Sequence, residues 1–123
     1  MSKKILFIED ESALQSAVGE VLTQKGYQML SALDGETGER LAGEEKPDLI
    51  LLDIILPKKD GFEVLRNLKK DPGTKDIPVI VLSNLEGGSD VEQALELGAT
   101  TYLVKINYTL EEVAEKIRNV LGN

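Results

Sequence analysis

Five short apolar runs divide the chain, and longer amphipathic stretches lie between them. The runs recur roughly every twenty to thirty residues and are rich in leucine, isoleucine and valine, which favours β-strands. We predict strands over residues 4–8, 27–32, 49–52, 79–82 and 101–104. Three of these runs are apolar almost throughout, as is typical of parallel strands that are covered on both faces of a sheet.

The stretches between the runs carry apolar residues at three- and four-residue spacing, which predicts amphipathic helices. We predict these helices over residues 12–25, 36–45, 61–70, 90–97 and 109–121. Ser12 is expected to cap the first helix, and Gly26 is expected to end it. Gly98 would end the fourth helix, and Thr109 with Glu112 would form a capping box for the fifth.

Strands and helices therefore alternate along the whole chain, which indicates an α/β fold. We expect a flavodoxin-like, doubly wound arrangement, in which five parallel strands in the order 2-1-3-4-5 carry helices on both faces. The chain shows no internal repeat, low-complexity tract or linker. Its 123 residues are the length of one domain, so we interpret residues 1–123 as a single, stand-alone domain.

The composition excludes several classes of function. The 22 acidic and 14 basic side chains give a net charge of −8 without a basic patch, so no direct nucleic-acid partner is expected. The chain has neither cysteine nor histidine, which excludes disulfides, thiolate or imidazole catalysis and the usual zinc sites. Its apolar runs are too short for a membrane span or a signal peptide, so we expect a cytoplasmic protein.

Polar side chains follow four of the five predicted strands. Ligands of doubly wound sheets bind beyond the carboxyl ends of the strands, so these positions are candidate site residues. They are Glu9 and Asp10 after the first strand, Asp53 after the third, Ser83 and Asn84 after the fourth, and Lys105 after the fifth. A strand that simply leaves the core explains any one of them equally well, but it explains all four strands together less well.

Glu9, Asp10 and Asp53 would form a cluster of carboxylates at this edge of the sheet. Close carboxylates repel one another unless a cation is present, and Mg²⁺ prefers oxygen ligands, phosphate oxygens among them. The cluster therefore predicts a Mg²⁺ site and, through the ion, a phosphoryl group. One carboxylate could attack phosphorus and become an acyl phosphate, with Lys105 and the Ser83 hydroxyl binding the phosphoryl oxygens.

The order and spacing of these residues resemble a response-regulator receiver domain of two-component signalling. The resemblance covers residues 3–121. Its motifs lie at residues 8–11 (IEDE), 48–57 (DLILLDIILP), 60–63 (DGFE), 78–83 (PVIVLS) and 98–105 (GATTYLVK). Each motif alone is weakly specific, but all of them in this order and at this spacing are very specific.

The resemblance implies a role for each matching residue. Asp53 would accept a phosphoryl group from a histidine kinase or a histidine phosphotransfer protein. Mg²⁺, or Mn²⁺ in its place, would be bound by Asp10, Asp53 and the backbone carbonyl of Ile55, and by Glu9 mainly through water. Such a domain is a phosphoacceptor that promotes its own phosphorylation and dephosphorylation, and it is not a multiple-turnover enzyme.

The resemblance also implies a conformational switch. Ser83 would move toward the phosphoryl oxygens, Lys105 would pair with them, and Tyr102 would turn inward. The surface formed by the fourth helix, the fifth strand and the fifth helix would then change. We expect that surface to bind a downstream protein target, or a second copy of the phosphorylated chain.

Two positions depart from the family's usual pattern. Ile106 follows Lys105 where most receivers have proline, so either this peptide bond is trans and the loop shifts, or strain is stored there. Asn84 stands where alanine or glycine is usual. Together with Ile55 and Leu85, it would rim the phosphoryl site and tune the lifetime of the phosphorylated state.

Three alternative functions stay open. A phosphate-independent pseudo-receiver would keep the fold and bind partners without accepting a phosphoryl group. A small Mg²⁺-dependent aspartyl phosphohydrolase would need a second acid two residues after Asp53, where Ile55 stands. A flavodoxin-like cofactor binder would need a phosphate loop after the first strand, where Glu9, Asp10 and Glu11 would repel phosphate.

Overall fold

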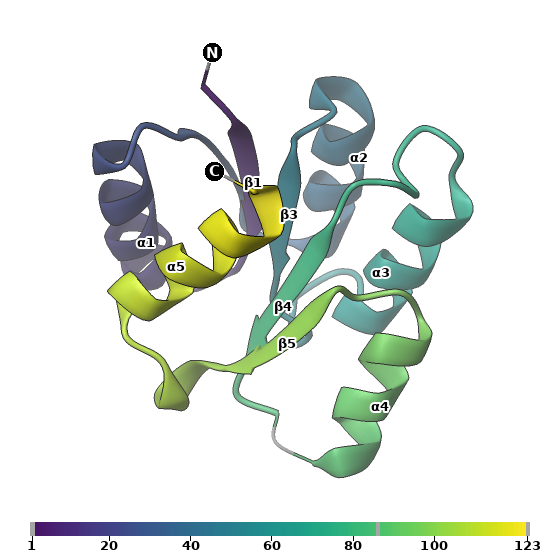
Figure 1. The fold of residues 1–123 in the computed structure, drawn as a ribbon. Helices are drawn as coiled ribbons and strands as arrows, with labels where there is room; N and C mark the ends of the chain where they lie inside the picture. The colour runs from purple at the N-terminus through teal and green to yellow at the C-terminus, as the bar shows by residue number, and fades with distance from the viewer. Residues whose placement is uncertain (1, 86, 123) are drawn as a thin grey trace.

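The computed structural model describes residues 2–85 and 87–122, which alternate between strands and helices (Figure 1). The elements are β1 (Lys4–Ile8), α1 (Ser12–Gln24), β2 (Gln28–Ala32), α2 (Gly35–Glu45), β3 (Leu49–Leu52), α3 (Gly61–Lys70), β4 (Val79–Ser83), α4 (Gly88–Glu96), β5 (Thr101–Val104), the short 3₁₀-helix η1 (Lys105–Asn107) and α5 (Leu110–Leu121). All predicted strands and helices are present. None of the described helices is long and apolar enough to span a membrane.

The five strands form one parallel sheet in the order β2-β1-β3-β4-β5, as the sequence predicts. β1 lies between β2 and β3, and its last residue, Ile8, pairs in register with both Ala32 and Leu52. The carboxyl ends of β1 and β3 are therefore neighbours. The flavodoxin-like, doubly wound fold is confirmed, and the side chains that follow these two strands start from adjacent positions.

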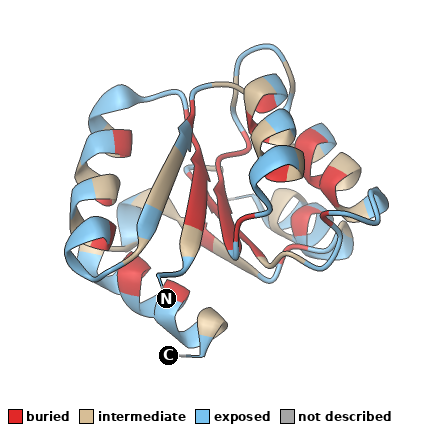
Figure 2. Cartoon of the chain, turned by 90° about the horizontal axis from the view of Figure 1, so that it is seen from above, coloured by how far each residue is buried: buried red, intermediate tan, exposed pale blue. Residues whose placement is uncertain are grey.

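Helices cover both faces of the sheet, so the strands are buried between two helical layers (Figure 2). α1 and α5 pack on one face, and α2, α3 and α4 pack on the other. Successive β1 residues enter opposite clusters: Ile5 and Phe7 on the α1 and α5 side, Leu6 and Ile8 on the other. This packing on both faces explains why the strands read as continuous apolar runs.

The predicted stop and cap signals are confirmed at three helix ends. Gly26 and Gly98 follow α1 and α4 with φ angles of +96° and +111°, a backbone region that residues other than glycine rarely adopt. Thr109 and Glu112 form the capping box of α5, through hydrogen bonds of 2.8 Å and 3.1 Å. These ends were readable from sequence because each depends on local backbone chemistry.

The predicted cap at Ser12 is wrong. Ser12 is the first residue of α1 itself, and Glu11 holds the cap position with an extended backbone. The backbone amide of Glu11 donates to the Glu9 carboxylate at 3.0 Å, and its carbonyl accepts from the amide of Gln15 at 3.0 Å. The acidic segment after β1 thus sets where the helix begins.

Other boundaries shift by one or two residues. α4 starts at Gly88 because the carbonyl of Gly87 accepts from the amides of Asp90 and Val91, so two residues of low helix propensity join the helix or its cap. β4 extends to Ser83, which pairs in register with Val104 of β5. Ser83 is therefore held by the sheet rather than by a loop.

Asp34 caps the first turn of α2. One carboxylate oxygen accepts from the backbone amide of Thr37 at 2.7 Å, and the other accepts from the Thr37 hydroxyl at 3.0 Å. The backbone hydrogen bond is the main cause that lowers the pKa of Asp34. We expect Asp34→Ala to reduce the free energy of unfolding by about 1 kcal/mol at neutral pH, as measured by urea denaturation.

This loss should depend on pH. The folded pKa of Asp34 lies below its unfolded value of about 3.9, so the stabilisation is complete above that value and disappears as the pH falls through the folded pKa. Glu44→Ala, at an exposed position of the same helix, is the control and should change stability by at most about 0.5 kcal/mol. Equal stability of Asp34→Ala and wild type at neutral pH would contradict the capping role.

Candidate functional site

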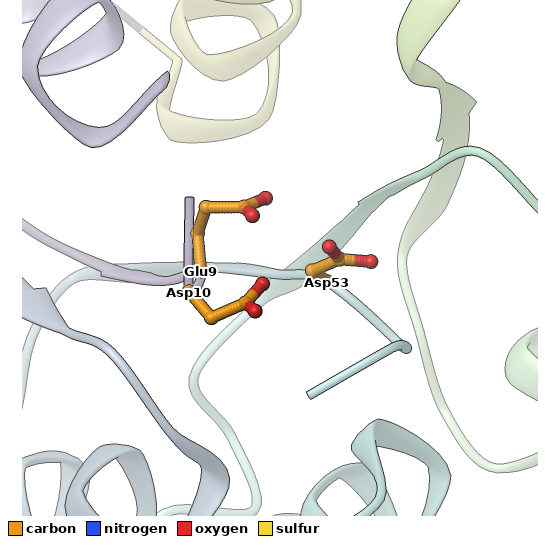
Figure 3. A group of neighbouring side chains, drawn as sticks. All are labelled: Glu9, Asp10 and Asp53. Atoms are coloured by element: carbon orange, nitrogen blue, oxygen red, sulfur yellow. The ribbon is translucent and has the colours of Figure 1, made fainter. Parts of the chain in front are cut away.

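Three carboxylates from two neighbouring strands meet at the carboxyl edge of the sheet (Figure 3). Glu9 and Asp10 directly follow β1, and Asp53 directly follows β3. The backbone continues the sheet here, since the Glu9 amide donates to Ala32 at 2.9 Å and the Asp53 amide donates to Ile8 at 3.0 Å. Each of the three residues offers a carboxylate oxygen, and these oxygens lie within 4.8 Å of one another.

The three carboxylates differ in exposure. Glu9 and Asp53 are buried, with 1% and 4% of their surface exposed, whereas Asp10 is exposed. Glu9 accepts the backbone amide of Glu11 at 3.0 Å, and Asp53 accepts the backbone amide of Ile55 at 3.2 Å. Asp10 therefore lies on the solvent side of the cluster, and the other two carboxylates lie on its inner side.

Lys105 supplies a positive charge to this cluster. Lys105 is the first residue of η1, and its Nζ lies 2.6 Å from Glu9 Oε1 and 2.9 Å from Asp53 Oδ2. Burial raises the pKa of Glu9, and the ion pair with Lys105 opposes this only in part. Burial by itself lowers the pKa of Lys105, but the ion pairs with both carboxylates outweigh this effect, so the pKa of this ammonium is raised. Lys105 is thus charged at neutral pH and compensates the buried acids.

Close packing of α3 holds the segment after β3 beside Asp53. The amide of Gly61, the first residue of α3, donates to the carbonyl of Ile54 at 2.8 Å. A Cβ atom at Gly61 would come within 2.5 Å of the Asp53 carbonyl oxygen, so only glycine allows the helix to begin there. This contact keeps the backbone of Ile55 next to the acidic cluster.

Ser83 and Tyr102 lie on the neighbouring strands β4 and β5, and Asn84 directly follows β4. Ser83 is completely buried at the end of β4, and Asn84, the next residue, is exposed. The hydroxyl of Tyr102 donates to the carbonyl of Leu85 at 2.7 Å, and its half-buried ring packs against the core. Burial raises the pKa of this hydroxyl, so it keeps its proton. Tyr102 thereby ties the segment after β4 to the sheet.

The peptide bond between Lys105 and Ile106 is trans. Of the two arrangements that the sequence allows, the structure therefore has the one without a cis bond. The chain turns through η1, and the Ile106 side chain is 72% exposed next to the site lysine. Ile55 beside Asp53 is likewise 58% exposed, so two apolar side chains lie at the rim of the site.

A family model described as the response regulator receiver domain matches residues 5–118. The chain is a response regulator receiver domain. The match includes both acidic strand ends, the buried serine and the site lysine, so the family resemblance seen in the sequence is confirmed. Domains of this family act in two-component signal transduction. The match therefore rules out the alternative that the chain is a flavodoxin-like cofactor binder.

Relatives agree with this assignment. The receiver domain is 41% identical over 118 residues to the DNA-binding dual master transcriptional regulator RpaA of Synechocystis sp., a match that covers 96% of this chain and 48% of that protein. The chain thus spans about half the length of this curated relative.

Two solved structures are similar in fold and contain a divalent ion. The receiver domain of sensor histidine kinase PA1611 from Pseudomonas aeruginosa PAO1 has a TM-score of 0.89 and 27% identity, covers both chains fully, and holds a magnesium ion in its active-site cleft. The Mn²⁺-bound form of response regulator Rcp1 has a TM-score of 0.79 and 34% identity, over 96% of this chain and 91% of that one.

The residues of this receiver domain fit such an ion. Its three clustered carboxylates offer only oxygen donors, which hard cations such as Mg²⁺ and Mn²⁺ prefer. Lys105 brings one positive charge to three acids, so the cluster stays short of positive charge. Exposed Asp10 leaves a route from solvent. The donor chemistry and the charge of the site therefore both suit a divalent cation.

Sequence reasoning missed two features of the receiver site. The ion pair between Glu9 and Lys105 gives no local signal, since nearly the whole chain separates the two residues. Gln15 is buried beside the backbone of Glu9, and here a signal exists. Gln15 lies three and seven positions before Val18 and Leu22, on the buried stripe of α1, where a polar side chain is unexpected.

Proposed function

We propose that this receiver domain accepts a phosphoryl group on Asp53, in a Mg²⁺-dependent transfer from the phosphohistidine of a histidine kinase or a histidine phosphotransfer protein. The position of Asp53 carries the proposal. This buried carboxylate lies 2.9 Å from the Lys105 ammonium and belongs to a cluster of three acids whose oxygens are within 4.8 Å of one another. The Lys105 ammonium, together with a divalent ion bound by the acidic cluster, would favour attack on a negatively charged phosphoryl group.

The transfer exchanges one bond for another. An oxygen of Asp53 bonds to phosphorus while the phosphorus–nitrogen bond of phosphohistidine breaks. The ring leaves as neutral imidazole, because its second nitrogen carries the proton. Lys105 pairs with the phosphoryl oxygens, and the Ser83 hydroxyl donates to them once it turns toward the site. Bound Mg²⁺ would offset the charge of the attacking carboxylate and of the phosphoryl oxygens.

Asp10, Asp53 and the backbone carbonyl of Ile55 would hold the ion directly, and Glu9 would hold it mainly through water. Two observations support this set of ligands. The carboxylates of Glu9, Asp10 and Asp53 already lie together, and packing of α3 on the strand end keeps Ile55 beside them. Mn²⁺, as in the Rcp1 structure, is a second ion that this donor set would accept.

Phosphorylation would act on the segment that follows β4. The added group brings a charge of about −1.5 to −2, and it would form new charge-assisted hydrogen bonds with Lys105 and Ser83. Movement of Ser83 would disturb Leu85, whose amide donates to the Ser83 hydroxyl at 3.5 Å and whose carbonyl accepts from the Tyr102 hydroxyl at 2.7 Å. Tyr102 would then turn further inward and change the surface of α4, β5 and α5. That surface would bind a downstream protein, or a second phosphorylated copy.

The rim of the site supports a protein as the phosphoryl donor. Ile55 and Ile106 are large apolar side chains with 58% and 72% of their surface exposed. Exposed apolar groups beside a reactive carboxylate suit the docking of another protein more than the binding of a small polar metabolite. Each chain would accept one group and pass on a signal, rather than turn over many substrate molecules.

Intact-mass spectrometry tests the proposal. The wild type is incubated with a small acyl-phosphate donor, with Mg²⁺ and without it. We expect a gain of one phosphoryl mass that requires Mg²⁺. No gain in either condition would refute the proposal in favour of a phosphate-independent pseudo-receiver. Continuous release of inorganic phosphate, many molecules per chain, would favour the aspartyl phosphohydrolase instead.

Asn84 is expected to influence the lifetime of the phosphorylated state. It is exposed directly after Ser83, and its amide would hinder the approach of the water that hydrolyses the acyl phosphate. Asn84→Ala should therefore speed dephosphorylation several-fold, as followed by the decay of the phosphorylated mass after the donor is removed. An unchanged decay rate would count against this role. Glu92→Ala, at an exposed position of α4, is a control that should leave the rate unaltered.

A further inference from the structure

A buried glutamine lies beneath the acidic cluster, and the proposed transfer makes no use of it. Gln15 belongs to the first turns of α1 and is 8% exposed. The same helix buries Val18 and Leu22, so an amide occupies one position of an otherwise apolar stripe. Burial of an amide costs free energy unless its hydrogen bonds are made. The partners of Gln15 therefore show what the residue does.

The side-chain amide of Gln15 joins the ends of β1 and β2. Its Nε2 has two N–H groups and lies 2.9 Å from the carbonyl oxygen of Phe7, 3.1 Å from that of Glu9 and 3.1 Å from that of Ala32. One N–H is therefore shared between two of these acceptors. Its Oε1 accepts from the hydroxyl of Ser31 at 2.7 Å. Three carbonyl oxygens from two strand ends thus converge on one nitrogen. The bond from Ser31 fixes which end of the amide faces them.

The bond to the Glu9 carbonyl connects Gln15 to the site. This carbonyl belongs to the peptide group between Glu9 and Asp10, and a peptide group is planar. Its orientation therefore decides how the backbone enters Asp10 and where the Asp10 side chain points. The preceding peptide group is held too, since the Glu9 amide donates at 2.9 Å to the same Ala32 carbonyl that Gln15 binds.

Asp10 depends on this support more than the other two acids. Glu9 and Asp53 are buried and both pair with Lys105. Asp10 is exposed, so its placement follows chiefly from its backbone. Loss of a group that orients a metal ligand through a hydrogen bond typically weakens metal affinity or activity about 10-fold to 100-fold.

We propose that Gln15 is a positioning residue that orients the peptide between Glu9 and Asp10 and thereby sets the affinity of the acidic cluster for Mg²⁺. The inference rests on the proposed function, because it takes this cluster to be the Mg²⁺ site. Gln15 acts through the backbone and does not contact the ion. Removal of its amide weakens cation binding although every ligand is still present.

Gln15→Met tests the inference, because methionine keeps the length of the side chain and removes the amide. Isothermal titration calorimetry of the full chain with Mg²⁺ is expected to give an affinity about 10-fold to 100-fold weaker than that of the wild type. Phosphorylation by an acyl phosphate should fall in the variant at low Mg²⁺ and recover at saturating Mg²⁺. That recovery distinguishes weaker ion binding from a damaged phosphoacceptor.

Two control variants separate positioning from stability. Val18→Ala truncates a buried apolar residue on the same stripe of α1 and lowers stability by cavity formation, but it leaves the Gln15 amide in place. Its Mg²⁺ affinity should stay within twofold of the wild type. Ser31→Ala removes only the bond to Oε1, and its Mg²⁺ affinity should lie between those of the wild type and Gln15→Met.

The outcomes distinguish failure of the role of Gln15 from failure of the proposed function. Equal Mg²⁺ affinity of Gln15→Met and wild type overturns the role of Gln15 and leaves the proposed function standing. An equal loss of affinity in Val18→Ala also overturns it, since stability alone would then explain the effect. A wild type that binds no Mg²⁺ overturns both proposals. If Gln15→Met does not fold, Ser31→Ala decides, and wild-type affinity in that variant overturns the inference.

Discussion

Asp53→Asn is expected to abolish phosphoryl acceptance. An asparagine amide cannot form the acyl phosphate that a carboxylate forms, and the cluster also loses one of its three acids. Incubation with an acyl phosphate and Mg²⁺ should add one phosphoryl mass to the wild type and none to the variant. Intact-mass spectrometry measures the difference, and circular dichroism checks that both proteins are folded.

Asp60→Asn is the matched control for this change. Asp60 lies in the same segment between β3 and α3, but its carboxylate caps α3 by accepting the amide of Phe62 at 2.7 Å. The side-chain oxygen of asparagine can accept the same bond, so the variant should fold and accept one phosphoryl group. A phosphoryl mass on Asp53→Asn would contradict the assignment, because another carboxylate would then be the acceptor.

Lys105→Met is expected to lower the free energy of unfolding more than the other substitutions proposed for this chain. Mg²⁺ should restore part of the lost stability. The ammonium of Lys105 lies 2.6 Å from Glu9 and 2.9 Å from Asp53, and both carboxylates are almost completely buried. Removal of one partner from a buried ion pair costs about 3 kcal/mol or more, since charge is left uncompensated. A divalent cation bound to the same acids supplies that compensation, so the loss should shrink as Mg²⁺ is added.

Thermal or urea unfolding with and without Mg²⁺ measures this effect. Lys59→Met is the control, because Lys59 pairs with Glu39 at 3.0 Å on a more exposed part of the surface. Its loss should be at most about 1 kcal/mol and should not change with Mg²⁺. Equal stabilisation of wild type and Lys105→Met by Mg²⁺ would show that the lysine and the ion do not compensate the same charges.

The phosphorylation rate of Lys105→Met tests whether the lysine has a second role, beyond compensating the charge of the buried acids. If its ammonium also binds the phosphoryl oxygens, the variant should react with an acyl phosphate about 100-fold more slowly even at saturating Mg²⁺. Restored stability together with slow phosphorylation would assign both roles to one side chain. Restored stability with a normal rate would limit Lys105 to charge compensation in the resting state.

The features of the fold that can be predicted from the sequence depend on local chemistry. Continuous apolar runs, helical spacing and the glycines at positions 26 and 98 predict the ten main elements, and the structure contains all of them. The order of the strands follows from general rules for α/β sheets, and the structure confirms it. The predicted cap at Ser12 is wrong because α1 begins one residue earlier, with Glu11 in the cap position and its amide donating to the Glu9 carboxylate. The local rule thus missed a contact that Glu9, three residues before Ser12, makes with the backbone at the start of the helix.

The candidate site divides in the same way. Strand ends identify Glu9, Asp10 and Asp53, since parallel strands bring their carboxyl ends to one edge, and the structure places these three acids together. The sequence does not predict how strongly each of the three acids is buried. Burial of Glu9 against exposure of Asp10 depends on how α1 and the loops pack over the sheet edge.

The sequence by itself determined the α/β class, the single parallel sheet and the residues at its carboxyl edge, because periodicity and strand-end chemistry act over a few residues. Only the tertiary structure decided that Lys105 pairs with Glu9 as well as Asp53, and that the Gln15 amide binds three carbonyls beneath the acidic pair. Both contacts join segments that are distant in sequence or belong to different elements. Their geometry exists only after the helices have packed on the sheet, and short-range patterns cannot encode it.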